Sequence, residues 1–232
     1  MKKRKDMAFH LSTVLTAIAS FLMGFIDAYT FLQQSEAFVS AQTGNMVSLS
    51  VKIFSGQWNE AMGHLWAFGG FAIGAFAGEA VLEHSSKKGL KKYRFYLLIQ
   101  TILLLFLALF QFQVTAAVML FILGALAGYE LTVFRKFRAS SINNGIMTGN
   151  MKNLMHHLYH FLFNRKSEAK SQFADLAFII IVFMLGAGMS TLIIQVNPDY
   201  ILWIAFVFSL LTYTWTTNYL AEFLPQKTDF PD

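Results

Sequence analysis

The chain has 232 residues, of which 56% are hydrophobic and 13% are charged, whereas soluble proteins carry roughly 25% charged residues. Its 18 Lys and Arg against 13 Asp and Glu give a formal net charge of +5. The basic residues stand in short clusters between long apolar runs, which is typical of a membrane protein and not of a nucleic-acid binder. Because the chain has no cysteine, disulfides, thiol nucleophiles, iron–sulfur clusters and cysteine-ligated zinc are excluded.

Six stretches are long and apolar enough to cross a bilayer, since a spanning helix needs about 20 mostly apolar residues. In chain order they cover residues 9–32, 62–82, 95–112, 114–134, 172–194 and 200–221. The third and fourth follow each other without a charged residue, which predicts a tight helical hairpin. None of the stretches alternates like a barrel strand. We therefore expect an all-α polytopic membrane protein with six transmembrane helices, in which residues 1–232 form a single membrane domain.

The basic residues predict the orientation. If the N-terminus lies inside, every Lys and Arg except Lys52 falls on the inner side of the six expected spans, as the positive-inside rule requires. This places both termini in the cytoplasm. The N-terminal basic run followed by an apolar stretch also resembles a signal peptide. Its polar residues, such as His10 and Thr13, and its counterpart later in the chain favour a span that is retained.

One tetrapeptide, Thr-Gly-Asn-Met, occurs twice, at 43–46 and at 148–151. Each copy follows a span and a polar stretch, precedes a short apolar segment and then leads to two more spans. This predicts two three-helix repeats, about 9–112 and about 114–221. Because three is odd, the second repeat enters the membrane from the opposite side. Inverted repeats are typical of transporters and channels, whose sites lie where the repeats meet.

These motifs carry a resemblance to a known family. Gly24-x-x-Asp27-Ala28, the segment from Phe38 to Asn45, and Thr148-Gly149-Asn150 are similar to the YoaK-type family of bacterial membrane proteins, a domain of unknown function. The similarity covers about residues 10–220. It implies a six-helix, multi-pass protein of the bacterial inner membrane and no established activity. The chain departs from the family pattern at Gly128-Tyr129-Glu130, where the family carries an amide.

Each Thr-Gly-Asn copy has residues suited to the start of a helix. Threonine caps exposed amides, glycine permits close backbone approach, and asparagine both donates and accepts hydrogen bonds. One interpretation is a pair of re-entrant half-helices that reach the middle of the membrane from opposite faces. The other is a pair of capped interfacial helices without a ligand. On the first interpretation, the pathway residues from the two copies are Thr43, Gly44, Asn45, Thr148, Gly149 and Asn150.

Two carboxylates lie inside expected spans, Asp27 toward the outer end of the first and Glu130 toward the inner end of the fourth. Carboxylates at membrane depth are costly, so they are functional candidates for an ion, a proton or a cationic solute. The alternative is that each accepts structural hydrogen bonds. Glu79 and Asp175 lie nearer the helix ends, and we expect structural roles for them.

Small residues and histidines mark two further features. Gly70, Gly74 and Gly78 share one helix face, and Gly124 and Gly128 repeat the pattern, which predicts helix packing within the bundle or between protomers of a homo-oligomer. His156, His157 and His160 crowd one helix, and the first and last have a spacing that holds metals. Because Lys152 and Arg165 would oppose a cation, we expect contact with anionic lipid there and no metal site.

We therefore expect a small-molecule secondary transporter or channel that lies in the lipid bilayer and carries an unknown small solute. The chain has no phosphate-binding glycine-rich loop and no catalytic motif, so we expect no cofactor, no nucleic acid and no enzymatic activity. Two alternatives stay open. One is a membrane-embedded enzyme that uses Asp27 and Glu130. The other is a structural or partner-binding membrane protein that transports nothing.

The orientation is testable because the chain has no native cysteine. We expect a membrane-impermeant thiol reagent to label Gln57→Cys on intact cells and Ser167→Cys only after permeabilisation, since an odd number of crossings separates the two positions. Labelling of both positions from the same face would contradict the inverted repeat. The cysteine-free parent provides the background.

Overall fold

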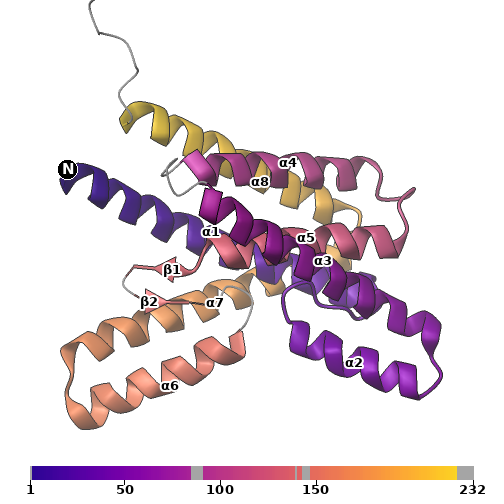
Figure 1. The fold of residues 1–232 in the computed structure, drawn as a ribbon, viewed down its shortest axis with the longest axis horizontal. Coiled ribbons are helices and arrows are strands. Elements are labelled where there is room, and N and C mark those ends of the chain that lie inside the picture. The colour runs from indigo at the N-terminus through magenta and orange to yellow at the C-terminus, as the bar shows by residue number, and fades with distance from the viewer. Residues whose placement is uncertain (1, 85–90, 139, 143–146, 224–232) are drawn as a thin grey trace, which may run out of the picture.

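A computed structural model describes residues 2–84, 91–138, 140–142 and 147–223. The described residues form eight helices and one short β-hairpin (Figure 1). The elements are α1 Lys2–Gln33, α2 Gln42–Phe54, α3 Trp58–His84, α4 Lys91–Leu109, α5 Ala116–Val133, β1 Lys136–Phe137, β2 Ser140–Ser141, α6 Met147–Asn164, α7 Ser167–Val196 and α8 Tyr200–Phe223. Lys87, Lys88 and Lys227, which contribute to the predicted orientation, lie outside the described residues.

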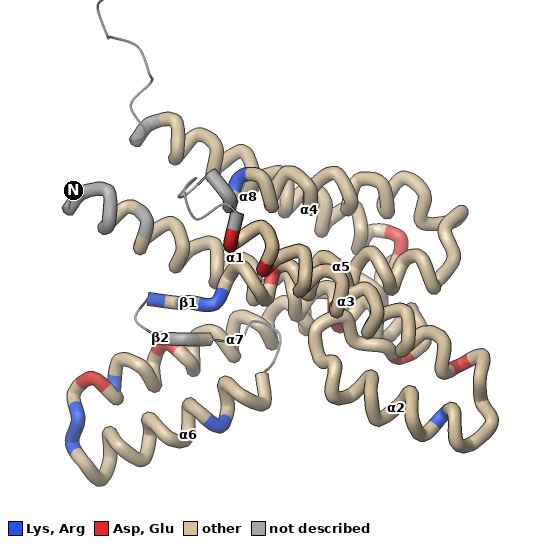
Figure 2. Tube along the Cα trace, in the orientation of Figure 1, with Lys and Arg blue, Asp and Glu red and all other residues tan. Residues whose placement is uncertain are grey.

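Five helices are long and apolar enough to cross a membrane. They contribute Phe9–Gln33, Trp58–Glu83, Ala116–Val133, Ser167–Val196 and Tyr200–Ala221, and a shorter apolar helix covers Tyr93–Leu109. The outer surface of the bundle carries large apolar side chains, such as Phe76 and Val196, both 80% exposed. Charged positions lie mainly at the helix ends (Figure 2). The protein is therefore an all-α, multi-pass membrane protein whose helices are apolar enough to sit in a lipid bilayer.

Helix pairing in the bundle crosses between the two parts of the chain. α3 packs along α5, α1 packs along α7, and α4 packs along α8, while each short helix packs on the helix that follows it, α2 on α3 and α6 on α7. α4 and α5 are joined by a short turn at 110–115, as the sequence predicts. They nevertheless pack mainly on other helices, because the small residues of α5 face α3.

Glycines bring α3 and α5 into backbone contact. A Cβ atom at Gly70 or Gly74 of α3 would clash with the carbonyl oxygens of Phe121 and Ala125 of α5. A Cβ at Gly128 of α5 would clash with the Phe71 carbonyl of α3 in return, and one at Gly124 would approach the Ala67 oxygen to 2.5 Å. Gly78 faces the Thr132 side chain instead. The glycines predicted to pack helices therefore lie inside the bundle, at this interface.

α1 and α7 meet in the same manner. A Cβ at Gly24 of α1 would clash with the Phe183 carbonyl oxygen of α7, and a Cβ at Gly186 of α7 would clash with the Phe21 carbonyl oxygen of α1. Helices in a bilayer gain no hydrophobic stabilisation from pairing, so such close van der Waals contact is what holds them together. The glycine spacing in the sequence indicated packing faces on α3 and α5. The structure has a second close crossing of this type, between α1 and α7.

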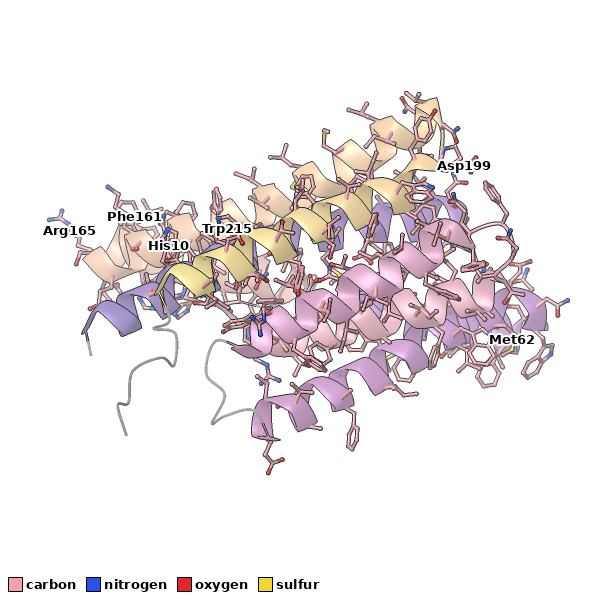
Figure 3. The ribbon with its side chains drawn as sticks, turned by 90° about the horizontal axis from the view of Figure 1, so that it is seen from above. His10, Met62, Phe161, Arg165, Asp199 and Trp215 are labelled. Atoms are coloured by element: carbon pink, nitrogen blue, oxygen red, sulfur yellow. The ribbon has the colours of Figure 1, made fainter. Side chains whose placement is uncertain are left out.

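The bundle has two distinct ends. His10, Phe161, Arg165 and Trp215 lie toward one end, and Met62 and Asp199 lie at the other (Figure 3). Between the ends, α1, α4, α5 and α8 enclose the main apolar core, which includes Leu22, Leu104, Leu123 and Ile201. Asp27, Gln100 and Glu130 are buried polar residues within the apolar helices α1, α4 and α5.

The glycine contacts predict different stabilities for two alanine variants of α3. Gly74→Ala should lower the thermal unfolding temperature, because overpacking typically costs about 1–3 kcal/mol. Gly69→Ala has no atom within 4 Å of the added Cβ and should be neutral or stabilising by up to about 1 kcal/mol, the helix-propensity gain of alanine over glycine. Thermal melts of the detergent-purified variants measure both, and equal melting temperatures would contradict the close crossing.

Candidate functional site

The chain turns back into the bundle after α1. Ser35 and Glu36 adopt left-handed backbone angles, with φ of 56° and 55°, a conformation that non-glycine residues seldom take. This tight reversal brings residues 37–41 alongside the last turns of α1, where Ala37, Val39 and Ser40 are buried. The loop therefore returns into the protein before α2 begins.

Asp27 of α1 holds this loop. Its Oδ1 accepts hydrogen bonds from the backbone N–H groups of Val39, at 2.9 Å, and Ser40, at 3.0 Å. Its Oδ2 accepts a bond from the Ser40 hydroxyl. The side chain is only 4% exposed. Hydrogen bonds to an ionised acceptor are stronger than those between neutral groups, so three donors give this carboxylate a structural role.

Asn45 of α2 holds the same loop from the other side. Its Oδ1 accepts from the Phe38 N–H at 3.0 Å, and its Nδ2 donates to the Phe38 carbonyl and, at 3.1 Å, to Gln42 Oε1. The Nδ1 of His64, on α3, lies 3.2 Å from Asn45 Oδ1. Asn45 and His64 are both buried. We call this set, Asp27, Phe38–Ser40, Asn45 and His64, the loop clamp.

The prediction that Thr43 caps α2 is wrong. The helix begins at Gln42, its N-cap is Ala41 without a side-chain bond, and Thr43 lies inside the helix with its side chain exposed. The Asn45 amide, instead of the threonine hydroxyl, satisfies the backbone before the helix, and this allows the helix to start two residues earlier. Thr148 also lies inside its helix, after Met147, and is exposed.

Gly44 is exposed, and a Cβ there would meet the Phe38 ring at 3.5 Å, an ordinary contact. The structure thus shows room for a small side chain at this position. Gly149 is half-buried. In both copies of the motif, the asparagine is the residue that the fold buries completely, since Asn45 and Asn150 are each 0% exposed.

The second half holds its loop with different residues. Asp175 of α7 accepts hydrogen bonds from Arg138 Nη1 at 3.0 Å and from the Ser140 hydroxyl at 3.2 Å. Asn150 donates to Met147 Sδ at 3.5 Å. Nearby, Arg135 forms an ion pair with Glu79 of α3. Asp175 and Glu79 therefore make structural contacts in this fold.

Glu130 of α5 has a different environment from Asp27. The Tyr96 hydroxyl of α4 donates to its Oε2 at 2.9 Å. Its Oε1 is buried and has no hydrogen-bond partner among the described residues. The Tyr96 ring stacks on the Tyr129 ring with centroids 4.8 Å apart, which fixes the hydroxyl beside the carboxylate.

A small cavity lies beside Glu130. Its polar lining consists of Glu130, Gln100 of α4, and Ser209 and Thr212 of α8, and the rest is apolar, largely from α1. The Ser209 hydroxyl also pairs with Thr101 at 2.9 Å. The volume of about 10 Å³ is close to the roughly 10–15 Å³ that one water molecule requires on this measure.

The structure does not bring the two intramembrane carboxylates together. Asp27 and Glu130 share no hydrogen-bond partner, and Asp27 does not line the Glu130 cavity. Sequence reasoning overlooked His64, Tyr96, Gln100, Ser209 and Thr212. Their signal was weak, because a single polar residue within an apolar stretch is visible in the sequence but its partners are not. Gln100 was the strongest such signal, since an amide is seldom placed in a span without a partner.

The short helices α2 and α6 are not among the candidate spans, but their surfaces are apolar. Met46, Val51 and Phe54 on α2 are 54–92% exposed, and Met151 and Tyr159 on α6 are 50% and 57% exposed. Such stripes favour contact with lipid. On α6, burial lowers the pKa of His157, and the neighbouring His156 and His160 lower it further.

A protein-family model described as "Protein of unknown function (DUF1275)" matches residues 15–215. The matched segment includes the loop clamp, both Thr-Gly-Asn motifs and the Glu130 cavity. None of the curated proteins and none of the solved structures matches the chain.

The loop clamp predicts unequal effects for two neighbouring residues. Asn45→Ala leaves the N–H and C=O of Phe38 unpaired and should destabilise the protein by about 1–3 kcal/mol for each buried group. Thr43→Ala changes an exposed side chain and should stay within about 0.5 kcal/mol of the parent. Thermal melts and the rate at which a cysteine at position 35 is labelled report both effects. Equal stability of the two variants would reduce Asn45 to a passive residue.

Proposed function

This chain belongs to the family described as a protein of unknown function (DUF1275), and from that premise we propose that it is a small-solute secondary transporter or channel of the bacterial inner membrane. We propose six crossings, with Tyr93–Leu109 of α4 as the sixth, and both termini in the cytoplasm. The observation that carries the proposal is the exchange pattern of helix pairing, which fits two inverted three-helix repeats.

Helices α1 to α4 of the first half correspond in order to α5 to α8 of the second half. When each helix is replaced by its counterpart, the set of main helix pairs stays the same. α1 packs on α7 as α5 packs on α3, α2 packs on α3 as α6 packs on α7, and α4 packs on α8, its own counterpart. The glycine contacts follow the same exchange. Gly24 approaches Phe183 and Ala187, while Gly128 approaches Phe71 and Ala75. The equivalent residues of α1 and α5 in these contacts differ by one constant number of positions in the sequence. Those of α3 and α7 differ by another constant number.

The short helices support the inversion. α2 and α6 diverge with their N-terminal ends toward the middle of the molecule and their C-terminal ends toward opposite ends (Figure 1). Two half-helices entering from opposite faces have this geometry. A helix N-terminus carries a partial positive charge, so this arrangement directs two positive helix ends toward the middle of the bundle. The exposed apolar stripes of both helices fit a position within lipid.

The pathway is proposed where the halves meet. The Glu130 cavity takes its lining from α1 and α4 of the first half and from α5 and α8 of the second. In inverted-repeat transporters, solute and ion sites lie at the repeat interface near the membrane centre. Gln100 and Ser209, near the middle of α4 and α8, fit that depth. Asn45 of the first Thr-Gly-Asn segment holds the start of α2 against the returning loop.

The enzyme alternative is less well supported. A reaction that needs paired carboxylates requires both within reach of one substrate, whereas Asp27 is engaged by three donors in the loop clamp. A purely structural protein has no need of an unpaired buried carboxylate oxygen. With no nucleotide-binding motif in the chain, the driving force would be an ion gradient or the solute gradient itself.

The test is flux through protein reconstituted in liposomes. A panel of ammonium, urea, glycerol, amino acids and organic acids is followed by stopped-flow light scattering and by electrophysiology on supported membranes. We expect at least one solute to move above the rate of empty vesicles. Thr212→Leu, which fills the cavity wall, should reduce that flux at least tenfold.

Thr214→Leu is the matched control, because Thr214 lies on the same helix and is exposed. It should transport like the parent protein. Equal flux through both variants would contradict a pathway at the cavity, and no flux above empty vesicles from folded protein would contradict transport.

A further inference from the structure

Two residues that line the Glu130 cavity each carry a buried acceptor atom without a donor. Glu130 Oε1 and Gln100 Oε1 have no hydrogen-bond partner among the described residues, and each residue is 3% exposed. An ionised carboxylate oxygen and an amide oxygen are both acceptors only, so they cannot satisfy each other. Leaving a buried polar group unpaired is unfavourable, because the group loses its hydrogen bonds to water and gains none from the protein. The cavity therefore favours an occupant that brings donors or positive charge.

None of the described residues that line the cavity or bond to Glu130 is positively charged. The ion pairs of the described residues join Lys52 to Glu60, Arg135 to Glu79 and Arg138 to Asp175. Each element facing Glu130 contributes neutral groups: α4 the Tyr96 hydroxyl and Gln100, α5 itself Tyr129, α8 Ser209 and Thr212, and α1 apolar side chains. An ionised carboxylate inside a bilayer without a counter-charge is unfavourable.

The lining also defines the size and the chemistry of the occupant. Its polar lining residues are Glu130, Gln100, Ser209 and Thr212, which carry a carboxylate, an amide and two hydroxyl groups. Oxygen ligands of this type suit small hard cations and not transition metals. A single carboxylate balances a single positive charge, whereas calcium takes six to eight oxygen ligands. The volume of about 10 Å³ accommodates one particle of the size of water.

We infer that the cavity beside Glu130 is a binding site for one monovalent cation, either Na⁺ held by oxygen atoms from both halves of the chain or a proton carried by the Glu130 carboxylate. The cation gives both unpaired acceptor atoms a partner and neutralises the charge of the carboxylate. Its ligands come from α4 on one side and from α5 and α8 on the other, so binding stabilises the contact between the halves. Its role as a coupling ion rests on the proposed function; its binding does not.

The binding test uses the purified full-length protein. Thermal melts at constant pH and ionic strength compare NaCl with KCl and choline chloride, because a ligand that binds only the folded state raises the melting temperature in a saturable manner. If the cation is Na⁺, NaCl alone should raise it. Glu130→Gln and Gln100→Leu should each increase the half-saturating concentration at least tenfold, and the exposed Glu60→Gln should leave it unchanged.

If the cation is a proton on Glu130, Na⁺ should have no specific effect. Infrared difference spectra between acidic and alkaline buffers should then show the carbonyl band of a protonated carboxylic acid, and this band should be absent from Glu130→Gln and present in Glu60→Gln. Should Glu130→Gln not fold, Gln100→Leu and Thr212→Val provide the Na⁺ readout, and each should shift the frequency of the Glu130 carbonyl band because it changes the surroundings of that group. The absence of both a Na⁺ effect and a Glu130 band would overturn the inference. A Na⁺ effect that Gln100→Leu leaves unchanged would also overturn it.

Binding and transport fail separately. Cation binding without flux of any solute would contradict the proposed function but would still support the cation site. Flux in the absence of cation binding would contradict the cation site but would still support the proposed function.

Discussion

The fold depends on two close helix crossings, α3 on α5 and α1 on α7, at which glycine removes the side chain between two backbones. In a bilayer, lipid tails solvate apolar side chains as well as another helix does, so pairing must come from close contact. Gly74 against Ala125 and Gly186 against Phe21 provide that contact. Each crossing joins a helix of the first half to one of the second, so the halves are interlocked.

The second constraint is the need to satisfy polar groups at membrane depth, and the chain meets it in two different ways. Asp27 has three donors from a loop that folds back on it, so the carboxylate and the loop stabilise each other. Glu130 has one donor, from Tyr96, and one bare oxygen beside a cavity. Two carboxylates that look equivalent in the sequence thus differ in what they can do. The first is engaged by its own fold, and the second is available to a ligand.

The glycine register explains why these carboxylates are not counterparts. Gly24 and Gly128 occupy matching places at the two crossings, but Asp27 follows its glycine by three residues and Glu130 by two. On a helix, one residue corresponds to a rotation of about 100°. Asp27 is therefore directed to the returning loop, whereas Glu130 is directed to α4 and the cavity, which is consistent with the departure of the second half from the Gly-x-x-Asp pattern.

The sequence by itself determined the fold class, the five long apolar helices and the small-residue faces, because each depends on local composition and helical periodicity. Hydropathy alone identifies residues such as 172–194 as membrane-embedded, and the spacing of Gly70, Gly74 and Gly78 alone puts them on one face. Tertiary structure decided which helix each face meets, that Asn45 rather than Thr43 organises the start of α2, and that Gln100, Ser209 and Thr212 gather beside Glu130. These residues are separated by up to about a hundred positions in the chain, and only the packing of α4, α5 and α8 against α1 brings their oxygen atoms to one cavity.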